Sequence, residues 1–495
     1  MQVKKLVSLC ALACAAMAGQ AHAAMSAAEQ AIVNDAVNNG RVIFISGASA
    51  TQKGFTGIIA SMFTGTPIRF ANTNASSKDF EAVAGVLASG AGPWSGQNVI
   101  IIDRVKGGSV FGVDSVARAQ AIESLKVTSA TCNDVALLDK LGNPITPGTA
   151  GNPYVCSTTA AAEYMVPDAG ISDVAPPLFK GPINTEGEIA APSLTAAELA
   201  LLKAYPIYSL AFGVPVTSNV PMVALNKTAV AAIMAGGIGT WDAVDSTLPA
   251  DDIVVCRRVP GSGTQAVDNL YFGNFPCGVA NEPADRDASE AWDPVARKYT
   301  VTPGTGGLVV VENSTSGDVR NCLDKAVTGG TYNTKDRSGQ PVVVDFGAGG
   351  HKAVGVMSMD SLKDSKSTGN WQFRSLNGAG TYTWDGAPTS SSPETAPPVA
   401  AGDGVFPSLA NLTDGNWDLQ GWISFNIPTR TTGNKLSVLN KFLAEARKPS
   451  LLGSISDLKY VAAAIPGNPG VTAGDQTLRV KYVQNNQCAP LNREY

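Results

Sequence analysis

The chain has 495 residues, of which 44% are hydrophobic and 16% are charged, and its formal net charge is −5. This acidic balance argues against a polyanionic partner such as nucleic acid, because such a partner needs a basic face. It does not exclude a small anion, since local donors and helix ends bind small anions whatever the net charge. A chain of this length can bury two or three hydrophobic cores.

The first residues have the pattern of a secretory signal peptide. A basic pair at 4–5 precedes an apolar stretch at 6–19, and the Ala-His-Ala at 21–23 supplies a cleavage site. The mature chain is therefore predicted to begin at Ala24. The apolar stretch is too short for a membrane helix, and no later segment reaches about 18 uninterrupted apolar residues. We expect a soluble protein, either periplasmic or secreted.

Two cysteines lie in the predicted signal peptide and six in the mature chain. The alternative is a lipoprotein signal that uses Cys14, but Ala11 stands where a leucine is normally found. The mature cysteines are Cys132, Cys156, Cys256, Cys277, Cys322 and Cys488. An even number in an oxidising compartment indicates three disulfides, for which fifteen connectivities exist. Proximity along the chain favours Cys132–Cys156 and Cys256–Cys277, and this leaves Cys322–Cys488.

A metal or another cofactor is not expected. The cysteine spacings match no zinc pattern, and the mature chain has a single histidine, His351. A lone histidine such as this one is more often structural than functional.

The hydrophobic pattern predicts strands that alternate with helices. Strands are expected at 42–45, 98–102, 206–223, 254–255, 341–346 and 353–359. Helices are expected at 27–39, 52–63, 113–125, 228–235, 264–272, 318–327 and 436–447. Loop-rich excursions are expected at 128–167, which carries two cysteines, at 278–297 and at 364–410. Alternation of this kind is typical of an α/β fold with a parallel sheet.

Three loops share one design, in which a strand is followed by small and hydroxyl residues and then by a helix. They lie at 47–51, 108–112 and 261–264. The first turn of a helix leaves backbone N–H groups unpaired, and the helix dipole adds partial positive charge there. Each loop alone is more often a capped turn. Three of them together with Arg258, which can form a charge-assisted pair, favour an oxyanion site.

Asp173 is the candidate that would select the anion. A carboxylate repels an anion unless the ligand has a proton to donate. Phosphate carries such a proton at neutral pH and sulfate does not, so a buried acceptor here would favour phosphate. The alternative role for Asp173 is to cap a turn ahead of two prolines.

A nucleotide site is a weaker interpretation of the same residues. The segment 261–266 fits the pattern G-x-G-x-x-A. Four residues separate it from the preceding strand, however, so the tight turn of a dinucleotide site is missing. The chain also contains no Walker A pattern.

The order of these segments resembles the substrate-binding proteins of phosphate ABC transporters, a branch of the type II periplasmic binding proteins. The matching segments are 47–51, 108–112, 172–173, 258–264 and 233–241, and the resemblance spans about residues 42–360. It departs from the family at Gln52, where an aromatic residue is usual, and at Pro260, where an acidic residue is usual. The segment between Ser109 and Asp173 is also longer than in the family.

The resemblance implies a two-lobed α/β fold with phosphate bound in the cleft between the lobes. Its implied ligands are Thr51, Ser109, Asp173, Arg258, Ser262, Gly263 and Thr264. The first lobe is expected at 24–210, with an insertion at about 128–167, and the second at 211–355. Residues 356–495 would return to the first lobe and add a loop-rich extension.

As a function, the resemblance implies a monomeric phosphate receptor that works with an ABC permease. One alternative is a surface or matrix protein that reuses this fold for interactions. A phosphatase or other hydrolase is another, but the sequence offers no metal cluster, no histidine-based triad and no closely spaced carboxylate pair. The protein is therefore not expected to be an enzyme.

Overall fold

The fold is taken from a computed structural model. The structure describes residues 24–73, 78–134, 146–156, 162–181, 183–185, 192–222, 224–278, 282–284, 291–302, 307–362, 369–377 and 404–494. The predicted signal peptide lies outside this part of the chain, as do parts of the three loop-rich excursions. None of the helices among the described residues combines the length and hydrophobicity that a membrane crossing requires.

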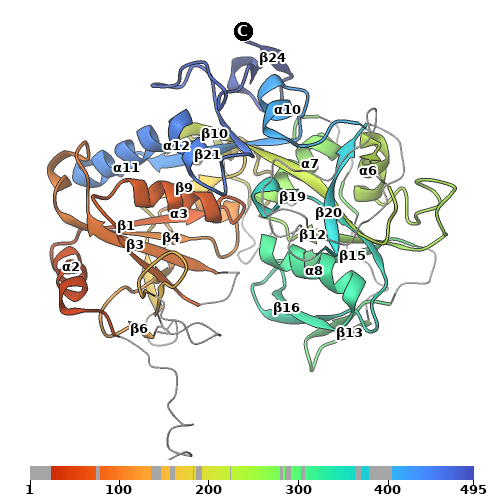
Figure 1. Cartoon of the computed structure of the whole chain (residues 1–495), viewed down its shortest axis with the longest axis horizontal. Helices are drawn as coiled ribbons and strands as arrows, with labels where there is room; N and C mark the ends of the chain where they lie inside the picture. Colours follow the sequence, from red (N-terminus) through yellow and green to blue (C-terminus); the bar gives the residue numbers. More distant parts are fainter. Residues whose placement is uncertain are drawn as a thin grey trace, which may run out of the picture.

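The molecule is mixed α/β, as predicted, and is built on one long twisted sheet. One end of the sheet contains β9 (Ala169–Ser172), β1 (Val42–Gly47), β4 (Asn98–Arg104), β3 (Phe80–Val86) and β2 (Ile68–Ala71). The other end contains β18 (Lys352–Gly355), β12 (Ile253–Arg258) and β15 (Val309–Asn313). Figure 1 shows the corresponding two halves side by side, a red, orange and blue half and a green and cyan half.

Two central strands join the halves. Strand β10 (Leu202–Thr217) pairs with β21 (Gln420–Pro428) along residues 202–211 and with β18, β19 (Met357–Ser358) and β20 (Trp371–Leu376) along residues 212–217. This strand is 16 residues long and apolar, and its second half is buried without interruption. A strand with this pattern is covered on both faces. The two halves therefore share one backbone hydrogen-bond network.

The C-terminal part of the chain contributes to both halves. Helix α11 (Gly433–Ala446) packs against α3 (Gln52–Ser61), where the rings of Phe55 and Phe442 are 4.8 Å apart. Strand β20 instead pairs with β11 (Ala224–Leu225) in the other half. The lobe boundaries at 210 and 355 stay predictions.

Most predicted elements are present, but the expected helix at 113–125 was wrong. Helix α4 covers only Asp114–Ala117, and Ala119 then adopts a left-handed conformation with φ +53°. Residues Ile122–Leu125 form strand β5, which pairs with β8 (Ala162–Met165). The local pattern could not indicate this strand, because its partner lies about 40 residues further along the chain.

The disulfides are Cys132–Cys156, Cys256–Cys322 and Cys277–Cys488. The first was predicted, and it joins β6 (Cys132–Asp134) to β7 (Tyr154–Cys156) within the expected insertion. The other two pairings were wrong. Cys322 lies on α8 (Ser316–Thr328), which packs on β12 and places its Cα 5.9 Å from that of Cys256. Cys277 follows α7 (Gly263–Gly273), and its Cα lies 5.3 Å from that of Cys488.

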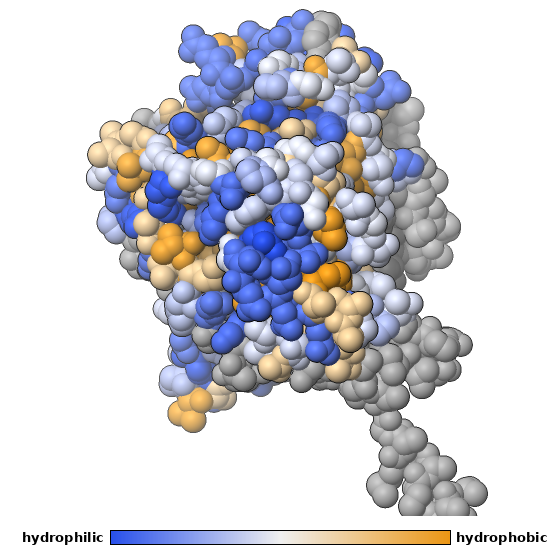
Figure 2. Space-filling view, turned by 90° about the vertical axis from the view of Figure 1, so that its left-hand side faces the viewer, coloured by the Kyte–Doolittle hydropathy of each residue, from blue (hydrophilic) through white to orange (hydrophobic). Residues whose placement is uncertain are grey.

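The side of the molecule that carries α2 (Ala27–Asn38) is mainly hydrophilic. In Figure 2 the hydrophobic residues on this face lie in small, separate groups. Large contiguous apolar patches are typical of protein interfaces. The monomeric state stays a prediction.

Candidate functional site

The predicted site residues lie where strands from the two halves end. Strands β4 and β9 both run parallel to β1, and β12 runs parallel to β15. Parallel strands end at the same edge of a sheet, and ligands bind outside that edge in open α/β sheets. The loops after β1, β4 and β9 thus face the loops after β12 and β15.

Helices begin directly after three of these strands. Helix α3 follows β1, α7 follows β12, and α8 (Ser316–Thr328) follows β15. Ser262 caps α7 by accepting from the N–H of Gln265 at 3.5 Å, and Thr315 caps α8 in a capping box with Asp318. The first backbone N–H groups of a helix remain available to an anion.

Arg258, at the end of β12, is the central cation of the site. Its side chain is 1% exposed. Nε donates to Asn313 O at 3.2 Å and Nη2 donates to Ser314 O. Nη1 donates to Ser49 Oγ at 2.8 Å and to Ser316 Oγ at 3.3 Å. Burial lowers the pKa of Arg258 to about 10, while the carboxylates of Asp173 and Asp318 favour its charged form.

Asp173 follows β9 and is also 1% exposed. Its backbone N–H donates to Ser109 Oγ at 3.3 Å, and Oδ2 accepts from Thr264 Oγ1 at 3.4 Å. Within the described part of the chain, Oδ1 is buried and accepts no hydrogen bond. Burial raises the pKa of Asp173 to about 7, although the charge of Arg258 and the Thr264 hydroxyl lower it.

Gly263 allows α7 to approach the opposite loops closely. A methyl group at this position would lie 2.2 Å from Ser109 Oγ and 2.6 Å from Asp173 Oδ2. Any larger residue would therefore separate the two sides of the site. The backbone N–H of Val110 also donates to Gly261 O at 3.0 Å. The loops after β4, β9 and β12 are thus in direct contact.

The structure brings six of the seven predicted residues together. Ser109, Asp173, Gly263 and Thr264 are joined by the contacts above. Ser262 and Arg258 lie beside the loop after β4, since a methyl group at Gly108 would be 3.2 Å from Ser262 Cα and 3.7 Å from Arg258 Nη2. Thr51 lies on the neighbouring loop, where its buried hydroxyl donates to Ala48 O at 3.2 Å. In this loop, Ser49 is the residue whose hydroxyl contacts Arg258. The assignment of these residues as ligands remains a prediction.

Sequence reasoning missed Ser316, although its segment carries the same signal as the other loops. Residues 314–317 read Ser-Thr-Ser-Gly between a buried strand and a helix. This is a fourth copy of the strand, small-residue loop and helix design. The helix was expected to begin at Asp318, but it begins at Ser316 with Thr315 as its cap, so Ser316 belongs to its first turn.

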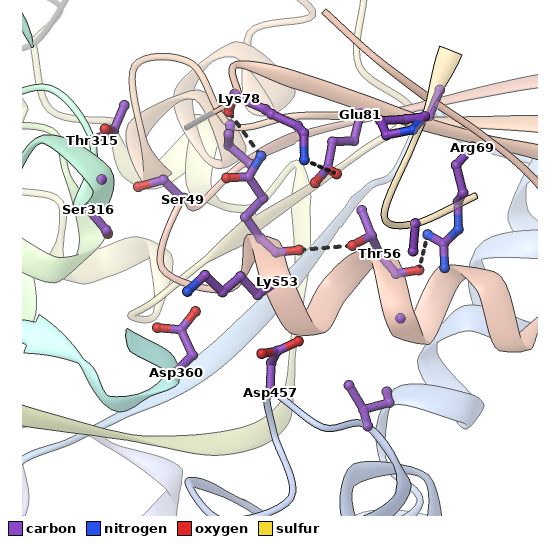
Figure 3. A pocket seen from close by; sticks show the side chains of 18 of the residues that line it. Ser49, Lys53, Thr56, Arg69, Lys78, Glu81, Thr315, Ser316, Asp360 and Asp457 are labelled. Carbon is purple, nitrogen blue, oxygen red and sulfur yellow. Dashed lines mark hydrogen bonds and ion pairs between the residues drawn. The ribbon is translucent and has the colours of Figure 1, made fainter. Parts of the chain in front are cut away.

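A cavity of about 380 Å³ adjoins the Arg258 contacts. Ser49 and Ser316, which both accept from Nη1 of Arg258, line one part of it. The other lining residues come from α3, β2, β3, the start of α8 and the C-terminal part of the chain. Figure 3 shows the amino group of Lys53 pointing toward Asp360, with Ser49 and Ser316 to one side and Asp457 below.

The described residues contain no group of three or more His, Cys, Asp or Glu side chains that could hold a metal ion. The side chain of His351 lies outside the Arg258 contacts. Its Nε2 is 3.2 Å from Phe346 O, and its ring packs on that of Phe346. These contacts give His351 a structural role.

No protein-family model and no curated protein matches the chain. Several solved structures have a similar course of the backbone. One is an ABC-type phosphate transport receptor from Vibrio cholerae, which has 12% sequence identity and a TM-score of 0.38; the match covers 85% of this chain and 99% of that chain. The high-affinity periplasmic phosphate-binding protein PfluDING has 15% identity and TM-score 0.40, with 85% and 90% covered. A phosphate-binding protein from Stenotrophomonas maltophilia has 12% identity and TM-score 0.33, with 84% and 83% covered. Values this low do not establish membership of a family.

Proposed function

We propose that this protein binds phosphate between its two halves and serves as the periplasmic receptor of an ABC transporter. The buried Oδ1 of Asp173 carries the proposal, because it accepts no hydrogen bond within the described part of the chain. A buried acceptor without a hydrogen-bond partner lowers the stability of the folded state, and a ligand that donates a hydrogen bond to it removes this penalty. Protonated phosphate is such a ligand.

The surrounding groups provide the donors that an oxyanion requires. Arg258 supplies a full positive charge, and the start of α7 supplies backbone N–H groups beside Ser262, Gly263 and Thr264. Hydrogen bonds to charged groups contribute about 1.5–3 kcal/mol each. Five or six of them therefore suffice for micromolar or tighter binding. Because α7 lies against Ser109 and Asp173, the two sides must separate to admit the ligand and then close on it.

Calorimetric titration of the phosphate-stripped mature protein with phosphate tests the proposal. We expect saturable binding to the wild-type chain and at least a hundredfold loss for Arg258→Ala. Arg257→Ala is the matched control, since Arg257 is the preceding residue of β12 but pairs with Glu312 at 2.9 Å. Full phosphate affinity in Arg258→Ala would overturn the site.

A further inference from the structure

The cavity beside Arg258 is much larger than an inorganic phosphate ion. Its volume is about 380 Å³, whereas a water molecule takes up about 30 Å³ of liquid. The cavity thus has room for on the order of a dozen waters, of which a five-atom oxyanion replaces only a few. Small-molecule sites begin at about 300 Å³. The cavity therefore has the size of a site for a small organic molecule.

The inner end of the cavity is suited to a phosphoryl group. Ser49 and Ser316 accept hydrogen bonds from the same guanidinium nitrogen of Arg258. A hydroxyl that accepts in this way keeps its own proton for another acceptor. The first turn of α8 also lines this end, at Ser316 and Gly317. The α8 dipole adds positive character there, and the helix has 13 residues.

The outer part of the cavity is polar and carries both signs of charge. Its cations include Arg69, whose Nη1 donates to Thr56 O at 2.9 Å, and Lys78, whose Nζ is 3.7 Å from Glu81. Gln52 and Lys53 of α3 line it as well. Side chains of this kind can donate to and accept from hydroxyl groups, whereas an apolar group would take them out of water without offering a hydrogen bond.

We propose that the ligand is a phosphate monoester with a small hydroxyl-bearing organic group. The phosphoryl group binds at the Arg258 end, and the organic group extends past Ser49 and Ser316 toward Arg69 and Lys78. This inference rests on Arg258 as the cation of the proposed oxyanion site. It places the phosphoryl group on the Ser49 and Ser316 side of that guanidinium and adds the class of ligand. The hydroxyls of the organic group bond to the polar lining, so the ester gains contacts that inorganic phosphate lacks.

The test is calorimetric titration of the mature protein with inorganic phosphate, glycerol 3-phosphate, glucose 6-phosphate and n-butyl phosphate. We expect one of the two hydroxylated esters to bind at least tenfold tighter than both inorganic phosphate and the butyl ester. If inorganic phosphate binds as tightly as the esters, or more tightly, the proposal that the ligand is a phosphate monoester is wrong. The proposed oxyanion site is not affected by that result. Absence of binding for all four compounds overturns both proposals.

Two substitutions locate the organic group. Arg69→Met and Lys78→Met are each expected to lower ester affinity at least tenfold more than inorganic phosphate affinity. Two variants are used because Arg69 donates to Thr56 O on α3 and its loss can disturb folding, which thermal melting detects. Lys325→Met, in the last turn of α8 and outside the cavity, is the control. Equal losses for ester and inorganic phosphate in both variants would show that the cavity does not hold the organic group.

Discussion

Ser49 and Arg258 lie 209 residues apart in the sequence, and Nη1 of Arg258 donates to Ser49 Oγ at 2.8 Å. Ser49 belongs to the loop after β1 in one half, and Arg258 ends β12 in the other. The bond therefore joins the two halves at the floor of the cavity. It also holds the guanidinium in place without neutralising its charge.

Ser49→Ala should weaken phosphate binding about tenfold. The substitution removes a hydroxyl that positions Arg258 and can donate to the ligand, and hydrogen bonds to charged groups contribute about 1.5–3 kcal/mol. Calorimetry measures the loss. Ser437→Ala is the control, because that hydroxyl bonds to Gly433 O within the exposed start of α11. Unchanged affinity in Ser49→Ala would remove Ser49 from the site.

Sulfate binding should depend on pH through Asp173. Burial raises the pKa of this carboxyl to about 7. Below that pH the neutral acid donates a hydrogen bond to sulfate, and above it the carboxylate repels sulfate, which has no proton to share. Sulfate affinity should therefore fall by up to tenfold per pH unit above pH 7, while phosphate binding persists.

Titrations between pH 5.5 and pH 8.5 check this expectation. Asp173→Asn should bind sulfate with little dependence on pH, because the amide does not ionise. A wild-type sulfate affinity that stays constant across this range would contradict the assigned role of Asp173.

Asp173 should also destabilise the folded protein at high pH. Its pKa is about 7 in the folded chain, against 3.8 for an ordinary aspartate carboxyl, so the folded state binds more protons between these values. The free energy of unfolding falls as pH rises through this window, by at most about 4 kcal/mol. Asp173→Asn should thus be more stable than wild type at pH 8 and about equal at pH 4.

Urea unfolding at the two pH values measures this difference. Asp242→Asn, at an exposed position, should show no such change. If Asp173→Asn were less stable than wild type at pH 8, the ionised carboxylate would be stabilising the fold, contrary to the prediction.

The three disulfides should differ in their contribution to stability. A crosslink restricts the unfolded chain more when it closes a longer loop. The resulting stabilisation of the folded state is about 3.5 kcal/mol for a loop of 24 residues and about 5 kcal/mol for one of 211. Removing Cys277–Cys488 by double serine substitution should therefore lower Tm more than removing Cys132–Cys156, which spans 24 residues.

Peptide mapping under non-reducing conditions identifies the pairs directly. We expect peptides that join Cys256 to Cys322 and Cys277 to Cys488. Recovery of a Cys256–Cys277 peptide from the folded protein would contradict this connectivity.

The sequence by itself indicated the α/β class, most helices and strands, and the loops that carry Asp173 and Arg258. Local signals are sufficient for these features, because strand hydrophobicity, helix capping and small-residue loops are properties of short segments. The sequence also indicated the Cys132–Cys156 bridge, whose two strands are close along the chain.

The tertiary structure alone decided which distant segments meet. The strand at Ile122–Leu125 forms because β8 pairs with it, and Cys256 bonds to Cys322 because α8 packs on β12. In the same way, the choice of Ser49 and Ser316 as the partners of Arg258 depends on how the ends of β1, β12 and β15 converge. These contacts arise from the packing of segments that are remote in sequence, and no local pattern encodes them.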